Sequence, residues 1–256
     1  MDNLKQTPQI QPNSKSTPKS QKDFLTHLEV YLAKRDGVDK LLKISRYASK
    51  IILASSFIEQ KNHFSDNLKN FESSVGLSRK AFRLGKFIQN INSLRGLEPD
   101  FNKDLIFNVV AYGSEGVYYF LEQFVWLAKS GLIDKKYLAN LTKFSAWFEF
   151  VGYIGSVSLK VKDLIKIEVD EKCLVESIEG LKGEGEGKGG GEVEKLRNVR
   201  EKKLMKRLSI VQDLADGLMA LVDISGGLGR FSTPLMVSSA GLLSAVISTH
   251  KNWVSC

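Results

Sequence analysis

Residues 77–97 read LSRKAFRLGKFIQNINSLRGL, and the polar and apolar side chains of this stretch separate at helical spacing. On a helix of about 100° per residue, one arc is polar and holds Arg79, Arg83, Lys86 and Asn90. The opposite arc is apolar and holds Leu84, Phe87, Ile88 and Ile91. With Ser78 as the N-cap and Gly96 as the stop, the pattern predicts an amphipathic helix over 78–95.

The charges of this helix are all of one sign. Its cations are Arg79, Lys80, Arg83, Lys86 and Arg95, with no acidic residue among them. A helix in water usually interleaves acidic residues at i,i+4, whereas a cationic polar face is typical of a helix that lies in a membrane surface. Near an anionic leaflet each cation contributes about 1 kcal/mol. The pattern therefore favours a lipid-surface helix over one packed in a protein core.

The same residues carry a family resemblance. The run GLSRKAFRLGKF, residues 76–87, resembles the signature helix of the peroxin-11 family. YLAKRDGVDKLLKISRYASKII, residues 31–52, and the end of the chain, 213–253, are similar to the plant branch of that family. The three motifs occur in the expected order and cover most of the chain.

The resemblance implies a peroxisomal membrane protein that elongates the membrane during peroxisome proliferation and fission. The headgroup contacts would be Arg79, Lys80, Arg83 and Lys86, and the inserted face would be Leu84, Phe87, Ile88 and Ile91. It also implies an integral protein whose termini face the cytosol. The implied partners are an anionic phospholipid membrane, further copies of the chain, other family members, and a fission adaptor with its dynamin-related protein.

The predicted fold class is all-α: a membrane-associated helical bundle with amphipathic helices and a C-terminal membrane-embedded helical hairpin. The first region, 1–22, is rich in proline and polar residues and predicts a disordered basic tail. A helical region over 23–166 follows, with helix boundaries expected near Asp36 and Gly37. The charged, glycine-rich segment 167–203 predicts a flexible linker, and 204–256 predicts apolar anchor helices.

The C-terminal region contains two apolar runs. Gly226 and Gly227 interrupt the first run, and Pro234 opens the second. The second run is about 20 residues long only if its basic and aromatic end lies at the membrane interface. Its small residues suit close packing against a helix partner: Ala240, Gly241, Ser244 and Ala245. A buried helix in a soluble bundle is the alternative.

Two further segments, 105–129 and 144–161, are apolar but carry acidic residues. An unpaired carboxylate costs roughly 2.5–3.5 kcal/mol at a bilayer centre, which weakens a spanning interpretation of the first segment. A packed or interfacial helix is preferred there. Glu115, Glu122 and Glu149 also support a second functional hypothesis, a membrane pore for small metabolites.

Composition places few limits on function. The chain has 256 residues, a formal net charge of +8 and two cysteines, so an anionic partner and a reducing compartment are expected. The three histidines are far apart, and no catalytic or metal-ligand spacing occurs, so neither an enzyme, a metal nor a cofactor is predicted. Charge alone suggests a nucleic-acid binder, but no recognition motif accompanies it, and no nucleic-acid partner is expected.

Overall fold

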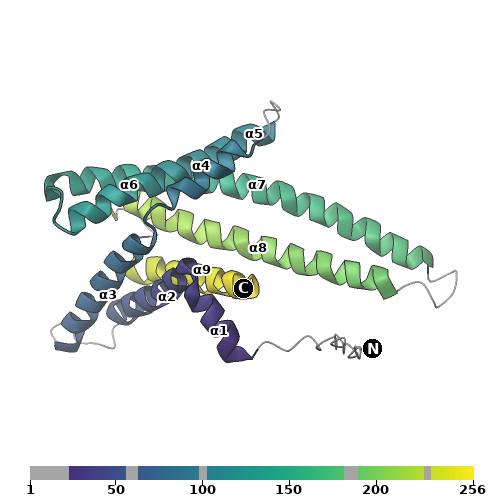
Figure 1. The fold of residues 1–256 in the computed structure, drawn as a ribbon, viewed down its shortest axis with the longest axis horizontal. Helices are drawn as coiled ribbons and strands as arrows, with labels where there is room; N and C mark the ends of the chain where they lie inside the picture. Colours follow the sequence, from purple (N-terminus) through teal and green to yellow (C-terminus); the bar gives the residue numbers. More distant parts are fainter. Residues whose placement is uncertain (1–22, 56–62, 98–102, 182–189, 228–231) are drawn as a thin grey trace, which may run out of the picture.

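The computed structural model describes residues 23–55, 63–97, 103–181, 190–227 and 232–256. Within these ranges the chain is helical and contains no strand, which confirms the predicted all-α class. The predicted tail, 1–22, and the most glycine-rich part of the predicted linker lie outside the described residues. The helices form a bundle from which the pair α7 and α8 extends on one side (Figure 1).

The first two helices meet at a tight corner. Helix α1 spans Phe24–Ala33 and α2 spans Arg35–Ala54, with an extended Lys34 between them. Gly37 is required at this corner, because an added Cβ would lie 2.1 Å from the Tyr31 carbonyl oxygen. The break therefore precedes the predicted one by a few residues, and Asp36 lies in the first turn of α2.

The predicted helix over 78–95 is two helices. Helix α3 spans His63–Phe82 and α4 spans Phe87–Arg95. Gly85 lies between them at a φ of 72°, a left-handed conformation that ends a right-handed helix. Ser78 is not an N-cap, since it lies inside α3 and its hydroxyl donates to the Ser74 carbonyl. Gly96 caps the end of α4, as predicted.

The next elements bring α6 and α7 together. Helix α5 (Lys103–Asn108) runs through a π-helical turn, η1 (Val109–Gly113), into α6 (Ser114–Lys129). A short 3₁₀ turn, η2 (Lys135–Tyr137), leads into α7 (Leu138–Leu181). Gly155 of α7 packs directly on η1, because an added Cβ there would lie 2.7 Å from the Ala111 nitrogen.

Most of the predicted linker is helical. Helix α7 runs to Leu181, and α8 spans Gly190–Ser225, so the two long helices form an antiparallel pair (Figure 1). Oppositely charged residues face each other along this pair: Asp163 with Lys206, Glu168 with Lys203 and Arg207, and Glu171 with Arg200 and Lys203. The flexible-linker prediction was wrong for the described part of 167–203.

The C-terminal hairpin follows the glycine and proline signals of the sequence. Helix α8 ends at Ser225, Gly226 and Gly227 have positive φ, and α9 spans Pro234–Val254 with its proline in the first turn. Helix α9 packs beside both α2 and α8. Gly241 permits the contact with α2, because an added Cβ would lie 2.2 Å from the Tyr47 ring.

Candidate functional site

A charged cavity of about 710 Å³ lies inside the bundle. Residues of α2, α3, η1, α6, α7, α8 and α9 line it, so residues far apart in the sequence meet there. Eleven Lys or Arg side chains and seven Asp or Glu side chains contribute to the lining. Burying so many charges is costly unless they are paired, so the pairing within the cavity wall determines how the bundle is held together.

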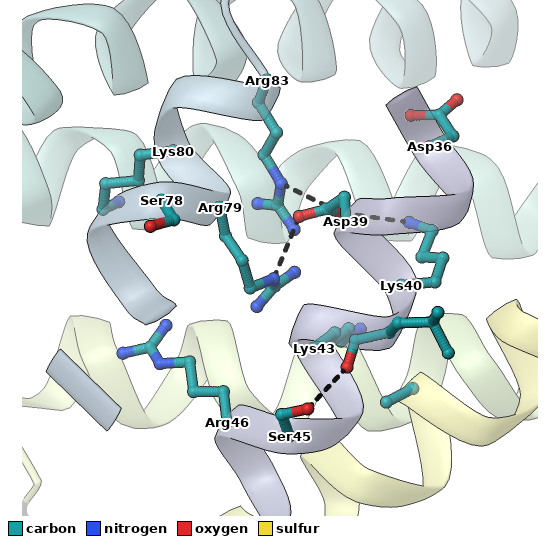
Figure 2. A network of polar contacts seen from close by, with 12 residues as sticks. Asp36, Asp39, Lys40, Lys43, Ser45, Arg46, Ser78, Arg79, Lys80 and Arg83 are labelled. Atoms are coloured by element: carbon teal, nitrogen blue, oxygen red, sulfur yellow. Dashed lines mark hydrogen bonds and ion pairs between the residues drawn. The ribbon is translucent and has the colours of Figure 1, made fainter. Parts of the chain in front are cut away.

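Asp39 of α2 is the central anion beside this cavity. It is only 1% exposed, and Arg79 Nε lies 3.0 Å from its Oδ1 while Arg83 Nε lies 3.6 Å from its Oδ2. Figure 2 shows both guanidinium groups directed toward Asp39. Burial alone would raise the pKa of the Asp39 carboxyl, but the charges of Arg83, Arg79 and Lys40 together hold that pKa below its ordinary value.

Lys43, one turn further along α2, joins three helices. Its ammonium donates to Asp216 Oδ1 of α8 at 2.8 Å and to Ser244 Oγ of α9 at 2.6 Å. The lysine and the aspartate are both buried, and burial lowers the pKa of Lys43. A buried charge that is stripped of its partner is strongly destabilising, so this contact fixes the place of α2 against the C-terminal hairpin.

Two other predicted cations pair across the bundle. Lys80 of α3 forms an ion pair with Glu122 of α6 at 2.5 Å. Lys86 lies 3.4 Å from Asp36 of α2, and the Asp36 side chain is 48% exposed. The Lys86 pair is therefore both the longer and the more solvated of the two, which makes it the easier pair to open.

The three glutamates of the pore hypothesis line the same cavity: Glu115, Glu122 and Glu149. Glu149 of α7 accepts a hydrogen bond from the Tyr153 hydroxyl at 3.2 Å. Burial, together with the nearby charge of Asp216, raises the pKa of Glu149 from 4.5 to about 7. Glu149 therefore titrates near neutral pH.

Lys40 has no comparably close counter-ion. Its ammonium lies 3.8 Å from Asp39, whose carboxylate already contacts two arginines. Burial and the charges of Lys86, Arg83 and Lys43 lower the pKa of Lys40 to about 7, although Asp39 acts in the opposite direction. The cavity wall beside Asp39 therefore carries more positive charge than the single carboxylate neutralises.

Many large apolar side chains are exposed on the outer surface. Leu84 in the turn before α4, and Ile88 and Ile91 on α4, are 37%, 52% and 46% exposed. Exposed large apolar residues also occur on α6, α7 and α9: Val117, Phe120, Phe144, Trp147, Leu243 and Val246. Many charged groups thus lie inside the bundle, and many apolar groups lie on its surface. Large exposed apolar patches mark contact surfaces in soluble proteins.

The basic and apolar side chains of 79–91 lie on different sides, but two helices carry them instead of one, and the basic side faces the protein. Arg79 and Asn90 are buried, and Lys80, Arg83 and Lys86 point to acidic or phenolic partners on other elements. Phe87 packs its ring edge-on against Phe120 of α6, with centroids 5.6 Å apart. The headgroup role of these cations stays a prediction.

The predicted small-residue contact surface has a helix partner within the chain. Gly241, Ser244 and Ala245 are buried, and the first two contact side chains of α2, whereas Ala240 is half-buried. Association with a second copy through these residues stays a prediction.

Among the described helices, α9 included, none combines the length and the apolarity of a membrane span. The membrane-embedded state of the C-terminal hairpin therefore stays a prediction. The described residues also contain no cluster of three or more groups suited to hold a metal ion.

Sequence reasoning missed the buried aspartates of the site. Asp39, Asp213 and Asp216 lie on helices whose apolar periodicity is clear, and an acidic residue on such a stripe is the signal that identifies a buried counter-ion. Ser156 and Lys160 of α7 both donate to Asp213 Oδ2 of α8, an arrangement that the sequence separation conceals.

Fold and site together define an all-helical protein with a charged interior and apolar side chains on its exterior. Its sequence matches the family model for peroxisomal biogenesis factor 11 (PEX11) over residues 25–253, and the chain belongs to that family. It is 58% identical to peroxisomal membrane protein 11A of Arabidopsis thaliana, covering 94% of this chain and 97% of the relative. It is 51% identical to peroxisomal membrane protein 11-3 of Oryza sativa subsp. japonica, covering 92% and 91%. No solved structure matches the chain.

Proposed function

We propose that this protein is a peroxisomal membrane protein that elongates the membrane during peroxisome proliferation and fission, by inserting the exposed apolar face of α4. Family membership supports the general role, and the relatives named as peroxisomal membrane proteins support the location. The observation that carries the mechanism is the exposure of Ile88 and Ile91 on α4 and of Leu84 in the turn before it.

The mechanism follows from the area that the inserted helix occupies. An interfacial helix buries its apolar face roughly 5–10 Å into one leaflet, which widens that leaflet relative to the other. Positive curvature results, and many copies side by side extend a tubule. Because α4 is joined to α6 by the Phe87 and Phe120 ring contact, the bundle holds the helix at its outer surface.

The ion pairs of Arg79, Arg83 and Lys86 limit which of these cations can contact a lipid headgroup. Arg79 and Arg83 must stay paired with Asp39, because the buried carboxylate needs their positive charge. The initial free energy of membrane binding therefore comes from burial of apolar side chains. Lys86 is the cation that reaches a headgroup first, since its partner Asp36 is half exposed. The resemblance further supports the proposals of an integral protein with cytosolic termini, self-association, and contact with other family members and the fission machinery.

The experiment uses the full-length protein and anionic liposomes. A variant with Ile88→Ser and Ile91→Ser removes exposed apolar groups without touching the cavity, and Val193→Ser removes an equally exposed group from α8 as a matched control. We expect flotation and tubulation to fall in the double variant alone. Tubulation by the double variant at the wild-type level would contradict the mechanism.

A second candidate function is a conduit for small polar metabolites. It is favoured by one observation, the convergence of Glu115, Glu122 and Glu149 on the same internal cavity. Conductance in planar bilayers that changes with Glu149→Gln would support it, and an unaltered bilayer resistance would contradict it.

A further inference from the structure

The cavity wall beside Asp39 has an uncompensated positive charge. Three cations, Lys40, Arg79 and Arg83, approach the Asp39 carboxylate at 3.8, 3.0 and 3.6 Å. One carboxylate faces two arginines and a lysine whose pKa burial lowers to about 7, so a net charge of between +1 and +2 remains there near neutral pH. All three cations line the cavity, so the surplus faces an open volume and not the packed core.

Donor groups remain unused at the same place. Arg79 is 5% exposed, and its Nη2 is buried with no hydrogen-bond partner. Arg83 Nε is likewise buried without a hydrogen bond, and it lies 3.6 Å from Asp39 Oδ2, a buried acceptor that also lacks one. Arg83 Nη1 donates to the Tyr118 hydroxyl at 3.0 Å. An unsatisfied buried donor costs free energy, and a donor on a charged group costs more. An acceptor that enters the cavity would recover this free energy.

Two carboxyl groups of the cavity, Glu115 and Glu149, have pKa values that burial raises, which favours their neutral forms. Three other carboxylates of the lining are already paired. Glu122 pairs with Lys80, Asp216 with Lys43, and Asp213 with Lys160. They are not placed to neutralise the surplus beside Asp39. An external anion that accepts several hydrogen bonds and carries one to two negative charges would match this surplus.

We propose that the cavity binds a phosphate monoester or inorganic phosphate through Lys40, Arg79 and Arg83. A phosphate dianion matches the local charge surplus, and its oxygens match the forked donors of arginine and the point charge of lysine. Aromatic hydroxyls of Tyr118 and Tyr119 line the same cavity and complete a polar wall around it. The source of the phosphate is either the headgroup of a phosphomonoester lipid or a free anion.

The test measures thermal stability and binding of the full-length protein in a neutral detergent. The probes are inorganic phosphate, dioctanoyl phosphatidic acid, and dioctanoyl phosphatidylglycerol, whose phosphate is a diester. Sodium chloride at equal ionic strength separates binding from general salt effects. Stabilisation by both inorganic phosphate and phosphatidic acid would show that a free anion is enough to fill the site. Stabilisation by phosphatidic acid alone would identify the lipid headgroup as the ligand.

The key variant is Lys40→Gln, which leaves the Asp39 pairs with both arginines in place. Lys136→Gln is the matched control, since it removes an exposed lysine that contacts only its chain neighbours Asp134 and Tyr137 among the described residues. We expect Lys40→Gln to weaken phosphate-monoester binding about tenfold, because it removes one charge-assisted contact. The affinity of Lys136→Gln should equal that of the wild type. Equal binding by Lys40→Gln and wild type, or stabilisation no greater than that by chloride, would overturn the proposal.

This inference does not depend on insertion of α4. The variant with Ile88→Ser and Ile91→Ser keeps the cavity and should bind phosphate like the wild type. Failure of tubulation and failure of phosphate binding are therefore separate results.

Discussion

Arg79 Nε of α3 lies 3.0 Å from Asp39 Oδ1 of α2, and both side chains are almost fully buried. The residue that the sequence suggests as a headgroup contact is therefore a structural partner of an acidic residue forty positions earlier. This pair connects α2 with α3 and so positions the turn that precedes α4.

Asp39→Ala should destabilise the bundle strongly, because it leaves two guanidinium groups buried without their counter-ion. Breaking a buried pair by removal of one partner typically costs about 3–5 kcal/mol. Chemical unfolding in detergent micelles, followed by circular dichroism, measures the change. Asp36→Ala removes a half-exposed carboxylate 3.4 Å from Lys86 and should cost under about 1 kcal/mol. Equal costs for the two variants would show that Asp39 is not the central anion.

Gly241→Ala should destabilise the contact between α9 and α2. The added Cβ would lie 2.2 Å from the Tyr47 ring, which has to move, and overpacking of this kind costs about 1–3 kcal/mol. Gly180→Ala is the opposite case, since nothing lies within 4 Å of its added Cβ. It should stabilise α7 by up to about 1 kcal/mol through helix propensity. Melting temperatures that move in the same direction for both variants would refute the close contact.

Glu149→Gln should stabilise the protein at alkaline pH and have little effect at acidic pH. The pKa of Glu149 is about 7 in the fold against an ordinary value of 4.5, so the folded protein holds this proton more tightly than the unfolded chain. Stability is then lost as pH rises from about 4.5 to about 7, by roughly 1–3 kcal/mol. Unfolding at pH 4.5 and pH 8 measures the difference. A stability gap between variant and wild type that is the same at both pH values would contradict the raised pKa.

Gly85→Ala should weaken the turn between α3 and α4. The φ of 72° at this position costs a residue with a Cβ about 1–2 kcal/mol. Because the substitution favours a continuous helix, it should also displace Ile88 from its present orientation. The rate of proteolysis and the free energy of unfolding report the loss of stability. If neither changes, the turn tolerates the alanine side chain and the prediction is wrong.

Local signals in the sequence predicted some of the element boundaries. Pro234 and the glycines at 226 and 227 define the hairpin between α8 and α9, and Gly96 ends α4. Gly85 was the available signal for the break between α3 and α4, and it was outweighed by the continuous amphipathic pattern on both sides of it.

Long-range pairing could not be read from the sequence. Lys43 and Asp216 are 173 positions apart, and periodicity on either helix gives no register between them. The same limit explains the error at 167–203, where acidic residues of α7 meet basic residues of α8 across the hairpin. A sequence segment that is highly charged is solvated alone but ordered once its opposite charges face each other.

The most direct measurement of the central claim is the membrane depth of position 88. Ile88→Cys, made with Cys173→Ser and Cys256→Ser and labelled with an environment-sensitive fluorophore, is compared with Val193→Cys in the same background on anionic liposomes. Insertion of α4 predicts a blue shift and quenching by lipid-borne quenchers at roughly 5–10 Å depth for position 88 alone. A label at position 88 that stays accessible to aqueous quenchers on bound protein would contradict insertion of this face.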